Sequence, residues 1–138
     1  MTRPGGWVEL VEMRYEAERA EPAVQRLLDL TRPFLAALEL DTSDTVYRNL
    51  DAYLTKAGLT NVVRHDAAVP VGRWGGTVGS LMVTTVRAGV TRVCEVLQGR
   101  GMLSGDEVRT LLQEALAEWE NGRMAYPAAV TYGQKPPV

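Results

Sequence analysis

The segment from Pro4 to Met13 constrains the fold of this chain more than any other part of its sequence. Pro4-Gly5-Gly6 predicts a tight turn, because proline fixes φ and glycine tolerates positive φ. The alternation that follows predicts a strand with Trp7, Glu9, Val11 and Met13 on one face, and Val8, Leu10 and Glu12 on the other. Apolar residues on both faces favour an interior strand over an exposed edge.

Two helices are predicted after this strand. The first has Pro22 in its first turn, where proline is tolerated. Because Pro33 cannot continue a straight helix, this helix is expected to kink or to divide into two near Thr31. The second covers residues 42–57, where several N-cap residues precede a regular amphipathic stripe. Gly58 is expected to end it as the C′ residue.

The middle of the chain predicts a strand and a long helix. Residues 60–69 begin with β-branched side chains and predict a strand, which Pro70 is expected to break. Residues 77–97 show helical periodicity and are apolar over a wide arc. Cys94 lies in this apolar helix and is expected to be an inert, buried thiol.

The C-terminal part predicts one more helix and one more strand. Ser104 and Glu107 have the spacing of a capping box, and the helix they open is expected to end at Gly122. Residues 125–132 predict a strand, and Pro127 within it indicates an edge or a bulge. Strands separated by helices predict an α/β fold, and the 138 residues are enough for a single domain, residues 1–138.

Composition excludes several classes of function. The formal net charge of −2 gives no electrostatic reason to bind nucleic acid or an anionic membrane. Cys94 and His65 are the only cysteine and histidine, so an internal disulfide and a zinc site of cysteine and histidine are excluded. No apolar run is long enough to span a membrane and no signal-peptide pattern is present, so the expected location is the cytoplasm.

Four segments resemble the C-terminal part of class I S-adenosylmethionine-dependent methyltransferases, in the branch of fungal and actinobacterial enzymes that act on small molecules. They are Pro4-Gly5-Gly6-Trp7-Val8-Glu9-Leu10 with Glu12, Lys56-Ala57-Gly58-Leu59, Val69-Pro70-Val71-Gly72-Arg73-Trp74, and Tyr132-Gly133-Gln134-Lys135-Pro136. Each is weak alone, but together they follow the order and spacing of the family. The resemblance covers essentially all of this chain and about half of a complete domain of usual size.

The resemblance implies a partial Rossmann-like methyltransferase sheet of three strands. The Trp7 and Thr60 strands would be parallel, with the C-terminal strand antiparallel and central. The family binds its cofactor with a Gly-rich loop and an acidic residue in its N-terminal half, and no such pattern occurs here. The cofactor-binding half is therefore expected to be lacking. S-adenosylmethionine would bind only if a partner completed the site, and no cofactor is expected for the isolated chain.

An open edge on the Trp7 strand implies a partner, either a second copy of this chain in a homodimer or a complementary methyltransferase half. Candidate substrate-binding residues are Glu12, Tyr15, Arg73, Trp74 and Tyr126. His65 is a weak candidate for a catalytic base, because histidine titrates near neutral pH. Each also has a structural interpretation: a solvated carboxylate for Glu12, and packing within a strand or the core for the others.

Three interpretations of function stay open. The chain is the substrate-side portion of a methyltransferase for a small molecule, inactive without its partner. Alternatively, it is a non-catalytic homodimeric binding or scaffolding domain, or the product of a truncated reading frame. The residues do not indicate which acceptor or which of its atoms is methylated, or whether the chain forms an oligomer.

Overall fold

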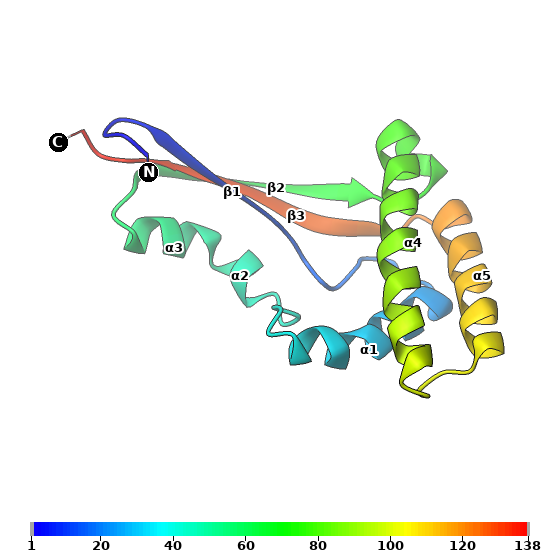
Figure 1. Ribbon diagram of the computed structural model, residues 1–138. Coiled ribbons are helices and arrows are strands. Elements are labelled where there is room, and N and C mark those ends of the chain that lie inside the picture. Colours follow the sequence, from blue (N-terminus) through cyan, green and yellow to red (C-terminus); the bar gives the residue numbers. More distant parts are fainter. Residues whose placement is uncertain (1, 138) are drawn as a thin grey trace.

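A three-stranded sheet organises the structure, a computed structural model that describes residues 2–137. The strand order is β1 (Trp7–Met13), β3 (Ala125–Gln134) and β2 (Thr60–Pro70), as Figure 1 shows. Strand β3 is antiparallel to both neighbours, so β1 and β2 run parallel to each other. The predicted arrangement, with the C-terminal strand antiparallel and central, is confirmed. Within residues 2–137 the fold is α/β, with five α-helices and an antiparallel sheet.

The turn before β1 forms as predicted. The N–H of Gly6 donates to the carbonyl of Arg3 at 2.9 Å, and Gly5 has φ +75°, as a type II turn with proline in its second position requires. The N–H of Gly5 donates to Lys135 at 2.9 Å, and the N–H of Lys135 donates to Gly6 at 2.8 Å. Hence the first and last of the four family-like segments pair with each other.

The prediction of an interior position for β1 is wrong for this chain. Strand β1 lies at the edge of the sheet and has only β3 beside it within residues 2–137. The face that carries Trp7 is open, and Trp7 and Val11 expose 54% and 61% of their surface. This face is open because the helices pack against the opposite face of the sheet, where Leu10 is half-buried.

Two short helices, α2 (Thr45–Arg48) and α3 (Leu50–Lys56), cover that opposite face, below the sheet in Figure 1. On this face Arg64 of β2 is paired with Thr131 of β3, and its Nη1 donates to the carbonyl of Tyr47 in α2 at 2.8 Å. Leu50 and Leu54 of α3 are buried.

The single helix predicted for residues 42–57 is broken at Asn49. This residue has φ −117° and ψ 15°, and its side-chain amide donates to the carbonyl of Thr45 at 2.8 Å. A side chain that bonds the backbone of the preceding turn competes with the helical ladder, which explains the break. The end of the helix is as predicted: Gly58 has φ +80°, and the N–H of Leu59 reaches back to Leu54 at 3.1 Å.

Three longer helices pack together at one end of the sheet: α1 (Pro22–Ala37), α4 (Gly76–Gly99) and α5 (Gly105–Asn121). Their shared core contains Leu27, Val71, Cys94, Leu111 and Trp119, so the predicted burial of Cys94 is confirmed. The predicted capping box is also present, because the side chains of Ser104 and Glu107 each accept a hydrogen bond from the backbone N–H of the other. Within residues 2–137, no helix combines the length and the apolar character that crossing a bilayer demands.

The prolines act differently from expectation in two places. Helix α1 continues through Pro33, so the division into two helices does not occur. Strand β2 includes Pro70 as its last residue instead of ending before it. Pro127 precedes Ala128, and Ala128 is the residue of β3 that pairs with Met13 at the end of β1. Its missing N–H therefore falls where β1 has ended, in agreement with an edge-like position.

Candidate functional site

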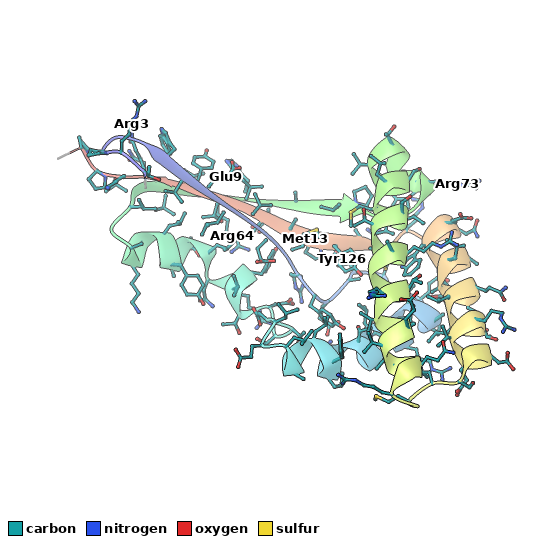
Figure 2. The ribbon with its side chains drawn as sticks, in the orientation of Figure 1. Arg3, Glu9, Met13, Arg64, Arg73 and Tyr126 are labelled. Carbon is teal, nitrogen blue, oxygen red and sulfur yellow. The ribbon has the colours of Figure 1, made fainter. Side chains whose placement is uncertain are left out.

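An open groove of about 430 Å³ lies at the carboxyl end of β1, bordered by α1 and α4. Leu28 and Leu35 of α1 form one side of it. The facing side of α4 carries Met82, Val86, Val90 and Val93. In Figure 2, Met13 and Tyr126 lie next to each other beside α4, where β1 ends and β3 begins. Open α/β sheets commonly bind ligands at the carboxyl ends of their strands, so this groove is the candidate site.

Three of the predicted site residues meet in this groove: Glu12, Tyr15 and Tyr126. The strand order explains why they do, because β3 starts beside the point at which β1 ends. The hydroxyl of Tyr15 donates to the carbonyl of Leu28 and lies 2.6 Å from Oγ1 of Thr31. These contacts fix the Tyr15 ring against α1.

Both phenols of the groove are held in their neutral form. Burial raises the pKa of the Tyr126 hydroxyl to about 12, and repulsion from the Tyr15 phenolate that forms at alkaline pH adds to this increase. Burial also raises the pKa of Tyr15, although its hydrogen bond with Thr31 acts in the opposite direction. Neither phenol can therefore serve as a base at neutral pH.

The other end of the groove is acidic. Glu12 and Asp41 line the groove and also an adjoining hollow of about 200 Å³ formed with Asp44 and Tyr47. The carboxylate of Asp41 accepts hydrogen bonds from Ser43 and from the N–H of Val46, and these bonds lower its pKa. Asp41 therefore stays ionised at neutral pH.

The third carboxylate, Asp44, is fully engaged. Its Oδ2 accepts from Nε of Arg14 at 2.8 Å, and its Oδ1 accepts from the N–H of Tyr15 at 2.7 Å. The Arg14 guanidinium gains a raised pKa chiefly from this hydrogen bond. Asp44 is buried and holds the end of β1 against the start of α2.

Arg73 and Trp74 lie outside the groove, in a short 3-10 turn before α4. Arg73 is 81% exposed, and its guanidinium lies 3.9 Å from the carboxylate of Glu120 in α5. The indole N–H of Trp74 donates to the carbonyl of Val71 at 2.9 Å. In Figure 2, Arg73 and Met13 lie on opposite sides of α4. The structure thus separates these two residues from Glu12 and the tyrosines.

His65 is also outside the groove, on the open face of the sheet. Its Nε2 lies 3.3 Å from the hydroxyl of Tyr132, and the ring of Trp7 stacks edge-on against the same tyrosine with centroids 5.7 Å apart. Because His65 is the only histidine of the chain, no imidazole reaches the groove. A base acting in the groove would have to be a carboxylate, Glu12 or Asp41.

Sequence reasoning missed the α4 wall and Asp41. The apolar arc of residues 77–97 is typical of a helix face packed in the core, but Met82, Val86 and Val90 are only half-buried and border the groove. The available signal was the width of the apolar arc, which is larger than α1 and α5 can cover. Asp41 gave no signal of its own, because it adjoins a run of ordinary N-cap residues.

The groove can hold a compound with an apolar body, which its acidic end would orient. Across residues 2–137, the structure places no group of three or more histidine, cysteine, aspartate or glutamate side chains where they could hold a metal ion.

A comparison of the sequence with protein-family models and with curated proteins gives no match.

Proposed function

We propose that this chain is the substrate-side portion of an S-adenosylmethionine-dependent methyltransferase that acts on a small molecule. In this proposal the cofactor site is contributed by a complementary chain. The observation that supports it most is the order of the strands, in which β3 lies antiparallel between the parallel strands β1 and β2. This order is the one that the family-like segments imply, and the groove lies at the strand end where such sheets bind ligands.

The open edge of β1 supports the need for a partner. The N–H of Arg14 and the carbonyl of Gly6 bond to β3, and both belong to even-numbered residues. Because an antiparallel strand alternates its bonding direction, the backbone groups of Trp7, Glu9 and Val11 point to the open edge. An apolar strand edge with free backbone groups is a template for pairing with another chain. A complementary half would cover both this edge and the exposed face.

The Gly-rich segment of this chain does not fit a cofactor-binding loop. The segment from Gly72 to Gly79 follows a strand and leads into a helix, as a ligand-binding loop would. However, a Cβ atom at Gly79 would lie 2.0 Å from the carbonyl oxygen of Gly72, and one at Gly72 would lie 2.3 Å from the carbonyl oxygen of Trp119. These glycines therefore allow close packing of the loop against α4 and α5, and they leave no room for a ligand.

The role of this chain in the proposed enzyme is to bind and orient the acceptor. The apolar walls exclude water from the body of the acceptor, and the Tyr15 and Tyr126 rings border it. Glu12 or Asp41 would accept a proton from the acceptor if its reaction releases one, since both phenols are neutral at physiological pH.

The test is co-purification of the tagged chain from its native host. The proposal predicts a stable complex with one other chain whose sequence contains a strand, a Gly-rich loop and a helix, followed by an acidic residue. A chain that purifies alone, or a partner without this pattern, contradicts the proposal. Identifying the partner by mass spectrometry decides between these outcomes.

A second candidate function is a non-catalytic, homodimeric binding domain. The exposed apolar residues Trp7, Val11 and Met13 favour it, because a second copy could cover the same face and edge. This candidate predicts a dimer of the purified chain in sedimentation experiments, and no binding of S-adenosylhomocysteine under any condition. The complementary-chain proposal predicts that the purified complex contains two different chains.

A further inference from the structure

We infer that the groove at the carboxyl end of β1 binds an organic cation, namely a compound with an apolar body of about one or two rings and an ammonium group. The inference deepens the proposed function, on which it rests only for the description of this groove as the acceptor site. It is carried by the apolar walls of the groove, by the unpaired carboxylates at one end, and by the engagement of the nearby arginines.

The walls fit an apolar body. The volume of about 430 Å³ lies within the range of small-molecule pockets, roughly 300–1,000 Å³. Gly89 lies in the middle of the α4 wall, and a Cβ atom there would meet no heavy atom within 4 Å. Gly89 therefore leaves a gap in a wall whose other residues, among them Met82, Val86 and Val93, carry larger side chains. This leaves space for a ring against the helix.

The acidic end fits a cation. Glu12 and Asp41 form the boundary between the groove and the adjoining hollow, because both line each of the two. Within residues 2–137, neither carboxylate has a salt-bridge partner. The Glu12 carboxylate accepts only the N–H of Met13, at 3.0 Å. The Asp41 carboxylate accepts three hydrogen bonds, from the N–H and hydroxyl of Ser43 and from the N–H of Val46. A carboxylate has two oxygens and about four acceptor positions, so Glu12 keeps most of its capacity for an ammonium donor and Asp41 contributes chiefly its negative charge.

The neighbouring arginines do not neutralise this end. Arg14, which also lines the groove, is held by Asp44 at 2.8 Å. Arg32 pairs with Glu16 and lies over the Tyr15 ring, 4.7 Å from its centroid. Because each arginine is paired with a carboxylate of its own, the charges of Glu12 and Asp41 are left uncompensated. An anionic ligand would meet repulsion at this end, and a neutral one would gain nothing from it.

The test compares three ligands that share an indole ring and an ethylene chain but differ in charge: tryptamine, its neutral analogue tryptophol, and indole-3-propionate. Each is titrated into the isolated full-length chain, with binding followed by ligand-observed NMR. Tryptamine is expected to bind up to about 5-fold more tightly than tryptophol, because a partly exposed ion pair adds at most roughly 1 kcal/mol. Indole-3-propionate is expected to bind more weakly than tryptophol. Equal affinities for the three, or no saturable binding of tryptamine, would overturn the inference.

Two pairs of variants locate the binding site. Glu12→Gln should reduce tryptamine affinity by up to about 5-fold and leave tryptophol unchanged. Glu9→Gln, on the same strand but outside the groove, should change neither. Gly89→Leu should abolish binding of both ligands by filling the groove. Gly99→Leu, at the end of the same helix, should not. Equal effects within either pair contradict the assignment to this groove.

The outcome is independent of cofactor binding. The titrations use the chain alone and no cofactor, so a failure here leaves the complementary-chain proposal standing. Conversely, tryptamine binding that depends on Glu12 would survive even if no complementary chain were found.

Discussion

At the scale of single residues, Asp44 determines the geometry at the acidic end of the groove. It is buried and has φ +60°, and its two oxygens bond Arg14 and the backbone of Tyr15. Aspartate and asparagine tolerate this left-handed conformation better than most residues. One side chain therefore fixes the loop before α2 and the residues that follow β1.

Asp44→Ala is expected to lower the free energy of unfolding by about 2–4 kcal/mol, because it leaves Arg14 and a backbone N–H without their acceptor and adds left-handed strain. Asp44→Asn keeps the conformation and one acceptor, so its cost should be clearly smaller. Urea unfolding of both variants measures the difference. Equal losses for the two substitutions would show that the acceptor of Tyr15 contributes nothing.

Tyr126 makes the stability of the folded chain depend on pH under alkaline conditions. Its pKa is raised from 10.0 to about 12 by burial, so the folded state binds the phenol proton more tightly than the unfolded state does. The contribution of this proton to the free energy of unfolding is fully present below about pH 10, and it is lost as the pH rises through about 12. Across this pH range the free energy of unfolding falls by an amount on the order of 2 kcal/mol.

Tyr126→Phe should remove this part of the pH dependence. The difference in unfolding free energy between wild type and Tyr126→Phe is therefore expected to be constant up to about pH 9 and to shift in favour of the variant above about pH 10. Urea unfolding across this range, together with the ultraviolet titration of the phenolates, measures it. A phenol that titrates at its ordinary pKa would contradict the half-buried position of Tyr126 between the sheet and the groove.

At the scale of elements, two glycines of α4 should respond oppositely to the same substitution. A Cβ atom at Gly79 would lie 2.0 Å from the carbonyl oxygen of Gly72, whereas Gly89 has open space around it. Gly79→Ala should destabilise the chain by roughly 1–3 kcal/mol through overpacking. Gly89→Ala should stabilise it by up to about 1 kcal/mol through helix propensity. Thermal unfolding of the pair checks this, and effects of the same sign would contradict the packing of α4 against the loop.

The exposed edge of β1 gives a second prediction about an element. Val11 is 61% exposed, and its backbone groups point away from β3. Val11→Lys should prevent assembly with any partner that covers this edge, while changing the stability of the monomer by less than about 1 kcal/mol. Arg92→Lys on exposed α4 surface is the control. Size-exclusion chromatography with light scattering would report assembly, and an unchanged complex would place the interface elsewhere.

Much of the arrangement of elements could be predicted from local chemistry. The capping box at Ser104, the turn at Gly5 and the helix end at Gly58 formed because each uses only neighbouring residues. The break at Asn49 was missed because its side chain could equally have faced solvent. Helix α1 continues through Pro33, which is exposed and lies beyond the buried residues of this helix, and the periodicity of one helix does not reveal this.

The site was predictable to the extent that it follows from strand order. Glu12, Tyr15 and Tyr126 come together because β1 ends beside the start of β3. Arg73 and Trp74 follow β2 and turn toward α5 and Val71, a consequence of tertiary packing. The α4 wall could not be assigned, because periodicity defines an apolar arc without showing which part of it neighbouring helices cover.

At the scale of the whole molecule, the apolar surface is unevenly covered. The helices bury one end of the sheet and one of its faces, as Figure 1 shows, while Trp7, Val11 and Met13 remain exposed on the other face. Tyr126 and Met13 continue this open face into the groove. A chain that covered the open face would therefore also approach the groove, which is how a complementary half could bring a cofactor to the acceptor.

The most direct test of the account is calorimetric titration with S-adenosylhomocysteine. The isolated chain and the chain purified together with its partner are titrated under the same conditions. The account predicts saturable binding by the complex, with one ligand for each pair of chains, and no binding by the isolated chain. Binding by the isolated chain would contradict the proposal that the complementary chain contributes the cofactor site, and a complex that does not bind would contradict the proposed function.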